Sequence, residues 1–270
     1  MSLLLRVFRL TLLMCLLLIG AMSVLLLKIF ERRPSHQSRV LKLARFWYQT
    51  MLVIMNVRVI QHGEYAHQAA MICANHISWL DIPVIGSQIP TYFLSKAELR
   101  QIPIVGWMAH QAGTLFIKRG AGEIGEVRSL IEDYLSRDHC LTFFPEATTG
   151  NGYGLRQFHP RLFAAAIDSQ TPVLPVALSY HCASQPELTI AFGDESLGAN
   201  LWRVLGRWRT DVHLTLLPLQ SEPQQTRRQL ADKSMHLIAD ALNLPAQRRG
   251  LDLRAPMPEG PAAAPPPENP

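Results

Sequence analysis

The amino-acid sequence predicts an α/β domain, in which a mixed, largely parallel sheet is flanked by helices, together with an N-terminal membrane-anchoring helical segment. From residue 57 onward, short apolar runs alternate with longer segments of helical periodicity, which is the pattern of α/β folds. Several of the runs are apolar throughout, as expected for strands that are covered on both faces. The anchor is indicated by an uninterrupted run without charge from Leu10 to Leu27.

Composition bounds the number of domains and the class of partner. With 270 residues, of which 48% are hydrophobic and 17% charged, the chain can bury one full core with appendages around it. The formal net charge of +5 favours an acidic partner. No zinc-finger spacing or RNA-recognition signature accompanies that charge, so we expect anionic membrane lipids and no nucleic acid. The cysteines form no C-x2-C pair and predict neither a metal site nor a redox motif: Cys15, Cys73, Cys140 and Cys182.

Residues 1–33 are predicted to be a retained hydrophobic anchor. The eighteen uncharged residues would span about 27 Å as a helix, close to the ~30 Å of a bilayer's hydrocarbon core. A cleaved signal peptide is the alternative, because the start is basic, but the apolar run is long and no small-x-small cleavage site follows it. The anchor either spans the bilayer or is embedded in one leaflet. The excess of Lys and Arg after it predicts that the main domain lies on the cytoplasmic side of the membrane, which we expect to be a bacterial-type inner membrane.

Residues 34–56 are predicted to form an amphipathic helix in the membrane interface. Cations recur every three residues at Arg39, Lys42 and Arg45, and the remainder up to Met55 is broadly apolar. This is the pattern of a helix that lies along a bilayer. A core helix of the soluble domain is the alternative, and the position directly after the anchor favours the interface.

The main domain is predicted to extend over residues 57–244. The expected strands are Val57–Gln61, Ala70–Ala74, Thr91–Ser95, Thr114–Lys118, Cys140–Phe144, Val173–Ser179, Leu188–Phe192 and Asp211–Leu217. The expected helices are Trp79–Ser87, a short proline-containing piece at Glu98–Ala109, Gly122–Arg137, Arg161–Ser169 and Gln225–Leu244. Pro245 ends the last helix, and the Pro/Ala-rich segment 245–270 is predicted to be a disordered tail.

A histidine and a carboxylate occur where one buried strand ends and the next element begins. The apolar run Met71–Ala74 leads into the stretch Asn75–Asp81, and open α/β sheets place their chemistry at strand ends. Neutral imidazole is suited to accept a proton near pH 7, and a nearby carboxylate can orient it and stabilise its charged form. The alternative is structural, because Ser78 and Asp81 have the spacing of a helix capping box. The two interpretations are compatible, since a carboxylate in the first turn of a helix can still face His76.

Three more stretches place polar side chains or prolines beside buried strands. Thr114–Gly120 has two cations before a glycine turn, Leu141–Gly150 has a carboxylate and hydroxyls, and Thr171–Val176 has prolines at the entry of an apolar run. Each has a structural alternative, because charged residues at strand ends are commonly solvated and Pro-Glu often begins a helix. None of the three specifies a reaction by itself.

Taken together, the four stretches resemble, in order and spacing, the sequence blocks of the glycerolipid acyltransferase family. That family includes 1-acyl-glycerol-3-phosphate acyltransferases and lyso-ornithine-lipid acyltransferases. The resemblance covers residues 55–220. The matches are N-H-x-S-x-x-D at Asn75, His76, Ser78 and Asp81; G-x-x-F-I-x-R at Gly113, Phe116, Ile117 and Arg119; F-P-E-G-T-R-S at Phe144, Pro145, Glu146 and Thr148; a proline-containing apolar strand at Pro172–Val176; and a Lys-x-Glu step at Lys96 and Glu98.

The resemblance implies an O-acyltransferase without a metal or a tightly bound cofactor, with acyl-CoA or acyl carrier protein as the thioester co-substrate. The acceptor it implies first is 1-acyl-glycerol-3-phosphate, which would give phosphatidate. A lyso-ornithine lipid or another lysophospholipid is the alternative. It also implies which side chains bind substrate: Asn75, Ser78, Lys96, Arg119, Glu146 and Thr148.

Two departures from the third block concern the acceptor. The family's glycine is Ala147 here, and the arginine expected after the threonine is Thr149. The resemblance implies that this arginine helps to hold the acceptor's phosphate in phosphate-using members. The Thr-Thr-Gly-Asn-Gly continuation is closer to the lyso-ornithine-lipid branch. The cations that could replace the arginine are Arg119, Lys96, Arg156 and Arg161.

The predicted reaction is acyl transfer from a thioester to the free hydroxyl of a lysolipid. His76 would act as general base and Asp81 would orient its imidazole, which copies the base–carboxylate half of a serine triad with the substrate hydroxyl in place of the serine. A positioned base contributes about 10²–10⁴-fold. Two alternatives stay open: a hydrolase that passes the acyl group to water, and a membrane-anchored lipid-binding protein that has the fold without the activity.

Overall fold

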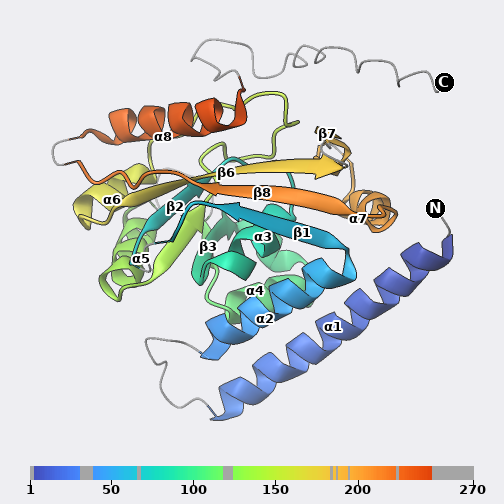
Figure 1. Ribbon diagram of the computed structural model, residues 1–270. Coiled ribbons are helices and arrows are strands. Elements are labelled where there is room, and N and C mark those ends of the chain that lie inside the picture. Colours follow the sequence, from blue (N-terminus) through green and yellow to red (C-terminus); the bar gives the residue numbers. More distant parts are fainter. Residues whose placement is uncertain are drawn as a thin grey trace, which may run out of the picture.

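The computed structural model of the chain describes residues 3–30, 39–65, 68–117, 124–182, 185–186, 188–193, 195–222 and 225–244. Its elements form three layers, with a central sheet that is covered by helices on both faces (Figure 1). The predicted tail at 245–270 lies outside the described residues.

The sheet is mixed and mostly parallel, as the sequence predicts. Its strands are β1 (Val57–His62), β2 (Met71–Ala74), β3 (Thr91–Lys96), β4 (Leu115–Ile117), β5 (Cys140–Phe143), β6 (Val173–Cys182), β7 (Gln185–Pro186) and β8 (Thr210–Leu216). Their order is β1-β8-β6-β2-β5-β3-β4, with β7 paired to the end of β6. From β6 to β4 all neighbours are parallel, whereas β8 runs antiparallel to β6 and parallel to β1. The carboxyl ends of β2, β3, β4, β5 and β6 therefore meet at one edge of the sheet, which is where parallel sheets place ligands.

One face of the sheet is covered by α3 (Asp81–Gln88), α2 (Arg39–Ile54) and α7 (Leu197–Leu205). Fully buried side chains on α3 and α7, including Val84, Ile85 and Leu205, pack with alternate residues of the strands. Burying a side chain of this size stabilises the fold by about 1.5–3 kcal/mol. Close packing of α2 on α3 depends on Gly86, because a Cβ there would lie 2.6 Å from the ring of Tyr48.

The opposite face is covered by α5 (Ile124–Ser136), α6 (Phe163–Asp168) and α8 (Arg227–Leu242). Cys73 and Phe143 point into this second core from the strands, and Met235 and Ile238 close it from α8. The start of α8 is defined by a capping box between Thr226 and Gln229. Because both faces are covered, the central strands are apolar throughout, which is why they were recognisable in the sequence.

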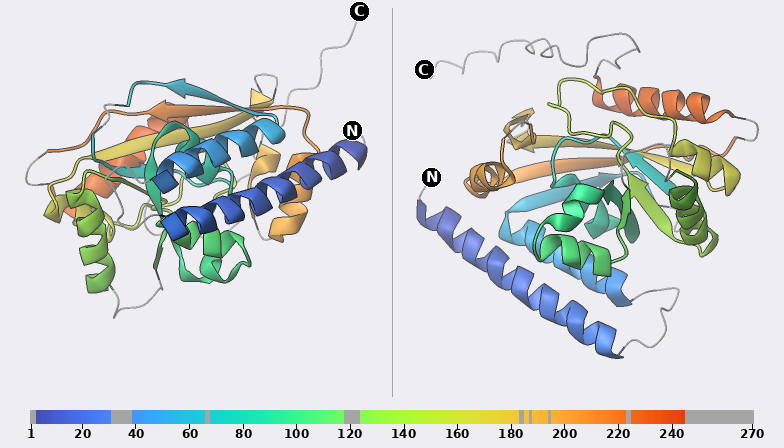
Figure 2. Two further views of the ribbon diagram at one scale, coloured as in Figure 1. Left: turned by 90° about the horizontal axis from the view of Figure 1, so that it is seen from below. Right: turned by 180° about the vertical axis from the view of Figure 1, so that it is seen from behind.

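Helix α1 (Leu3–Phe30) lies outside the domain proper and packs lengthwise against it (Figure 2). It contacts α2, α7 and α4 (Val105–Gln111). The indole of Trp47 on α2 donates to the carbonyl of Leu16 at 2.9 Å, and Gly20 leaves room for that ring. The segment Leu3–Leu26 is long and apolar enough to cross a membrane. Its outward side is apolar at Leu3, Leu4, Val7, Phe8, Leu12, Met14, Leu18, Ile19, Met22, Leu25 and Leu26.

The prediction of a strand at Leu188–Phe192 is wrong. The segment forms a short 3-10 helix, η2 (Leu188–Ile190), because β2 and β8 already occupy both sides of β6. Ile190 is instead buried in the core, and the N–H of Phe192 donates to the carbonyl of Ile77 at 2.9 Å. The segment thus crosses towards the loop that follows β2.

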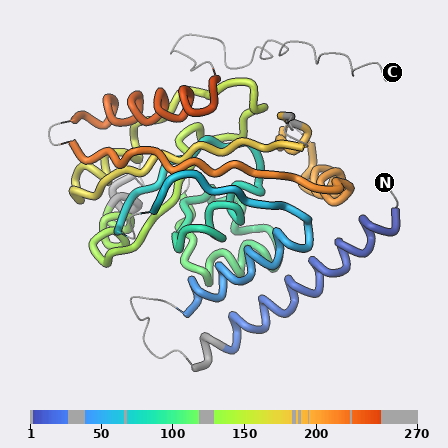
Figure 3. The backbone as a smooth tube through the Cα atoms, in the orientation of Figure 1, coloured from blue at the N-terminus to red at the C-terminus, as the bar shows by residue number. Residues whose placement is uncertain are grey.

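The single helical piece predicted at Glu98–Ala109 is divided into a 3-10 helix, η1 (Ala97–Gln101), and α4. Pro103 explains the division, because the residue before a proline is driven into extended backbone. Ile102 has that conformation, with φ −67° and ψ 118°. Two elements, α7 and β7, were not predicted from the sequence. The remaining predicted strands and helices are found with ends shifted by a few residues, and the tube drawing follows their path from α1 to α8 (Figure 3).

Candidate active site

The stretch that contains His76 is a loop between β2 and α3, at the carboxyl edge of the sheet. Asn75 fixes its start. Its amide donates to the carbonyl of Leu178 at 3.0 Å and accepts from the N–H of Leu178 at 2.8 Å. These bonds extend the pairing of β2 with β6 beyond Ala74, whose partner is Val176. The amide of Asn75 is therefore part of the sheet's own hydrogen bonding, and its side chain is buried.

His76 and Asp81 form a hydrogen-bonded pair. Nδ1 of His76 lies 2.8 Å from Oδ2 of Asp81, and the imidazole stacks on Phe144, with ring centroids 3.9 Å apart. The histidine side chain is 18% exposed, whereas the aspartate is fully buried. A carboxylate accepts only, so the geometry assigns the proton of the neutral ring to Nδ1. Nε2 then has the lone pair, which is the arrangement of a general base.

The carboxylate of Asp81 is held by donors on all sides. Oδ2 also accepts the backbone N–H groups of Ile77 at 2.7 Å and Ser78 at 2.9 Å. Oδ1 accepts the hydroxyl of Tyr180 at 2.5 Å. Burial, and then the charge of Asp81, raise the pKa of Tyr180 well above its usual value, so the phenol keeps its proton and donates it. Charge-assisted bonds of this kind satisfy a buried carboxylate.

Both interpretations of the Ser78–Asp81 spacing have a counterpart in the structure. Helix α3 begins at Asp81, after Leu80, and no side-chain bond caps it. The carboxylate nevertheless reaches back to the N–H of Ser78, which is one half of a capping box. The hydroxyl of Ser78 is buried and faces the N–H of Leu80 at 3.4 Å. The same carboxylate thus orders the first turn of the helix and faces His76.

Glu146 joins the loop after β5 to the loop after β2. Its Oε1 accepts the N–H of His76 at 2.8 Å, and its Oε2 accepts the N–H of Arg156 at 2.9 Å. Burial raises the pKa of Glu146 from its usual 4.5 to about 7, against the lowering effect of these two N–H groups. The N–H of Gly150 also donates to the carbonyl of His76 at 2.7 Å. The backbone of His76 is therefore held on both sides by the third sequence block.

The two residues that depart from the family pattern have definite environments. Ala147 has φ +59°, in the left-handed region that favours glycine. The hydroxyl of Thr149 donates to the carbonyl of Phe192, whose N–H donates to Ile77. Thr149 thus connects the third block, through one peptide of the 190–193 segment, to the loop that contains His76.

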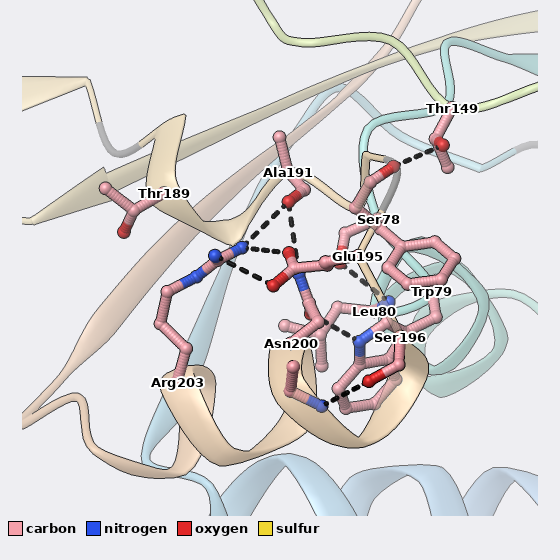
Figure 4. Close-up of polar contacts among 12 residues, drawn as sticks. Ser78, Trp79, Leu80, Thr149, Thr189, Ala191, Glu195, Ser196, Asn200 and Arg203 are labelled. Carbon is pink, nitrogen blue, oxygen red and sulfur yellow. Dashed lines mark hydrogen bonds and ion pairs between the residues drawn. The ribbon is translucent and has the colours of Figure 1, made fainter.

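A hydrogen-bond network that starts on α7 supports the loop between β2 and α3 through Trp79 (Figure 4). The indole N–H of Trp79 donates to Oδ1 of Asn200 at 2.8 Å. The amide nitrogen of Asn200 donates to the carbonyl of Ala191 at 3.1 Å and to Glu195 at 2.7 Å. Arg203 forms an ion pair with Glu195. Asn200 is fully buried with both ends of its amide bonded, so Trp79 has one defined position.

The structure brings together some of the predicted site residues and separates others. His76, Asp81, Asn75, Ser78 and Glu146 lie in one hydrogen-bonded cluster. Lys96 is exposed at the end of β3, and Thr148 is exposed beside Glu146. Arg119 lies outside the described residues.

Tyr180 was not identified as a site residue from the sequence, although its position on a buried strand could have indicated it. Alternate residues of β6, including Val176, Leu178 and Tyr180, are buried on one face. A tyrosine at a core position of an apolar strand requires a partner for its hydroxyl. Within the described ranges, no group of three or more His, Cys, Asp or Glu side chains is placed to hold a metal ion.

Comparison with known proteins places this arrangement in a family. A family model described as Acyltransferase matches residues 56–179. The chain is 39% identical over 216 residues to the lyso-ornithine lipid O-acyltransferase of Pseudomonas aeruginosa, covering 78% of this chain and 83% of that protein. It is 32% identical over 166 residues to the 1-acyl-sn-glycerol-3-phosphate acyltransferase of Neisseria meningitidis, covering 60% of this chain and 65% of that protein.

A solved structure shares the fold. The crystal structure of the 1-acyl-sn-glycerophosphate acyltransferase from Thermotoga maritima aligns with a TM-score of 0.67 over 90% of this chain and 95% of that one. The two sequences are 19% identical over the alignment, so this likeness concerns the architecture alone.

Proposed function

Because the chain belongs to the acyltransferase family and is an O-acyltransferase of the lysolipid type, we propose that it moves a fatty acyl group from a thioester to the free hydroxyl of a lyso-ornithine lipid. Acyl-CoA or acyl carrier protein is the proposed donor. The observation that supports the reaction is the His76–Asp81 pair, in which the carboxylate is buried and fully bonded while the imidazole is partly exposed.

In the proposed mechanism His76 accepts the proton of the acceptor's hydroxyl through Nε2. The hydroxyl oxygen attacks the thioester carbonyl, and the tetrahedral intermediate collapses to the new ester by expelling the thiolate. The imidazolium then returns its proton to that thiolate. Asp81 keeps the ring oriented and stabilises its charged form, the role of the carboxylate in a serine triad. Asn75, Ser78 and Glu146 are proposed to hold the loop in position, because their polar groups bond to backbone.

The test of the reaction is thiol release by the purified chain in detergent, with and without lysolipid. The wild type is expected to release thiol mainly when lysolipid is present. His76→Ala should lose about 10²–10⁴-fold in rate. His236→Ala, which changes an exposed histidine on α8, is the matched control and should keep full activity. Release of thiol at the same rate without lysolipid would identify a hydrolase instead.

The acceptor is proposed from Thr149 and from the relatives. The family resemblance implies an arginine after the threonine of the third block in phosphate-using members. This chain has Thr149 there, and its hydroxyl donates to the carbonyl of Phe192. The relative that is 39% identical carries the name of a lyso-ornithine lipid acyltransferase. Lysophosphatidate is the second candidate, supported by the relative from Neisseria meningitidis. For that acceptor Arg156 is the candidate cation, because its backbone N–H donates to Glu146, which also accepts the N–H of His76.

Offering both acceptors to the wild type and to Thr149→Arg tests this assignment. The wild type should favour lyso-ornithine lipid. The added guanidinium should raise the relative kcat/KM for lysophosphatidate, because it supplies a bidentate partner for phosphate. Thr149→Val removes the same hydroxyl without adding charge and is the control. A wild type that uses only lysophosphatidate would overturn the acceptor assignment and leave the reaction class intact.

The membrane is the proposed location of both the chain and its acceptor. Helix α1 exposes one apolar side while its other side packs on α2, α4 and α7. In this docked position we propose that it lies within one leaflet, with the domain on the cytoplasmic side of a bacterial-type inner membrane. Deleting residues 2–33 should weaken flotation with vesicles, and a truncated chain that still floats fully would assign the attachment to another surface, such as α2.

A further inference from the structure

A second polar pocket lies at the β8 end of the sheet's carboxyl edge. It has a volume of about 330 Å³, and four arginines line it: Arg6, Arg203, Arg207 and Arg209. Trp208 forms part of its rim. We call this the arginine pocket. Apart from Arg203, which pairs with Glu195 in the network behind the catalytic loop, none of its residues has a role in the site described above.

The guanidinium of Arg6 is the one most available to a ligand. It lies over the ring of Trp202, 5.5 Å from the centroid, and against Gly206. Within the described ranges, no carboxylate pairs with it. A cation stacked on an aromatic face is held in place without being neutralised.

The other cations around the pocket are fixed by the fold. Arg209 pairs with Asp211 at 2.9 Å, and Arg203 pairs with Glu195. Arg9, one turn further along α1, donates to the backbone carbonyls of Leu205, Arg207 and Trp208. These bonds join the start of α1 to the turn between α7 and β8, so the pocket exists only when α1 is docked.

The residues around the pocket are of the types found at the depth of lipid headgroups in a bilayer. The N-terminal end of α1 lies beside α7 in each view (Figures 1 and 2). Leu4, Phe8 and other apolar residues are exposed on that end, and Trp208, whose carbonyl accepts from Arg9, is 73% exposed. Exposed tryptophan and arginine beside an apolar helix face are typical of the membrane–water boundary.

Helix α7 separates the pocket from the catalytic loop. Trp202 and Gly206 are four residues apart and share the side of α7 that faces Arg6. Asn200 is on the opposite side of the helix and bonds Trp79. The arginine pocket and the catalytic loop thus contact α7 through different residues, Trp202 and Gly206 on one side and Asn200 on the other.

We propose that the arginine pocket binds the phosphate of an anionic glycerophospholipid of the bilayer, as a lipid site separate from the acceptor site. Guanidinium groups bind phosphate oxygens through paired N–H bonds, and about 330 Å³ accommodates a headgroup phosphate with its glycerol. Occupation of the site would hold the start of α1 and the α7–β8 turn at the bilayer surface. The inference rests on the membrane location proposed above and goes beyond the acyl-transfer reaction.

Flotation of the full chain with vesicles tests the site. Neutral phosphatidylcholine vesicles report attachment through the apolar helix, and vesicles that also contain phosphatidylglycerol report the anionic contribution. The wild type should bind the anionic vesicles more tightly. Arg6→Gln should lose about fivefold of that increment, since an arginine near an anionic surface contributes about 1 kcal/mol. Arg137→Gln, which removes an exposed charge directly after the end of α5, should retain it.

A titration with soluble short-chain phosphatidylglycerol separates a built site from general surface charge. Saturable binding that Arg6→Gln weakens, and that His76→Ala and Arg137→Gln keep, would support the proposal. Equal weakening by Arg137→Gln, or equally tight binding of inorganic phosphate, would overturn it. Loss of binding in His76→Ala would also overturn it, because the lipid would then occupy the acceptor site. If the full chain does not float with neutral vesicles but still binds the soluble lipid saturably, the proposed attachment through the apolar helix is overturned and the lipid site in the arginine pocket is not.

Discussion

The hydroxyl of Tyr180 donates to Oδ1 of Asp81 across 99 residues of sequence, at 2.5 Å. The bond joins the end of β6 to the first residue of α3. The other oxygen of the same carboxylate accepts from His76. Tyr180 is thus a positioning residue for the proposed base, because it fixes the carboxylate that orients the imidazole.

We expect Tyr180→Phe to impair both stability and turnover. The substitution leaves a buried carboxylate oxygen without its donor, which costs about 1–3 kcal/mol of the free energy of unfolding. Loss of alignment at His76 should lower kcat by about tenfold to a hundredfold, with a smaller effect on KM. Denaturant unfolding and steady-state thiol release measure the two effects. Tyr153→Phe, at an exposed position, is the control, and an unchanged kcat in Tyr180→Phe would refute the positioning role.

Trp79→Phe tests the network behind the loop. The change keeps an aromatic six-membered ring but removes the pyrrole ring with the N–H that Asn200 accepts, so Oδ1 of Asn200 loses its bond. We expect a loss of about 1 kcal/mol in stability and a lower kcat at nearly constant KM. Trp107→Phe on α4 is the matched control. If kcat is unaffected while stability falls, the network serves the fold and not the alignment of His76.

Ala147→Gly should make the protein more stable. Ala147 has φ +59°, a conformation that costs an L-residue with a Cβ roughly 1–2 kcal/mol and costs glycine almost nothing. The greater chain entropy of glycine in the unfolded state offsets part of this, leaving a gain of about 1 kcal/mol. The same substitution at Ala164 in α6 should destabilise by about 1 kcal/mol. Thermal unfolding of the two variants distinguishes them by sign.

The raised pKa of Glu146 predicts that the free energy of unfolding falls as the pH rises. Its pKa is raised by burial from the usual 4.5 to about 7 in the folded state. Between these values the folded chain keeps a proton that the unfolded chain has released, so the free energy of unfolding decreases with pH and levels off above about 7. The full change amounts to about 3 kcal/mol.

The measurement for this prediction is the pH dependence of the unfolding free energy in Glu146→Gln against the wild type. The variant should show a flatter profile across the window from 4.5 to 7. Glu98→Gln, at an exposed carboxylate in η1, should follow the wild type. Parallel profiles of wild type and Glu146→Gln would contradict the raised pKa.

Patterns within short stretches of the sequence predicted most strands and helices and the position of the candidate base. Continuous apolar runs such as Met71–Ala74 identify strands covered on both faces, and the block around His76 and Asp81 places the candidate base at a strand end. The strand predicted at 188–192 does not form, although its composition is typical of strands, because no strand edge is free to pair with it. Which edges are free depends on the order of strands that are distant in the sequence. Tyr180 and Asn200 were missed for the same reason. Their roles depend on which loop the sheet and α7 bring beside them.

The pairing of the first strand with the last has a consequence for biogenesis. Asn56, immediately before β1, donates to the carbonyl of Trp208, 152 residues later, and β1 lies at the sheet's edge against β8 alone. A ribosome that adds about 5–20 residues per second needs on the order of ten seconds to supply that partner. Helix α1 emerges long before this, with its apolar surface uncovered by α7. With the membrane attachment proposed for α1, the nascent chain meets the bilayer before its sheet is complete, and β1 pairs with β8 only afterwards.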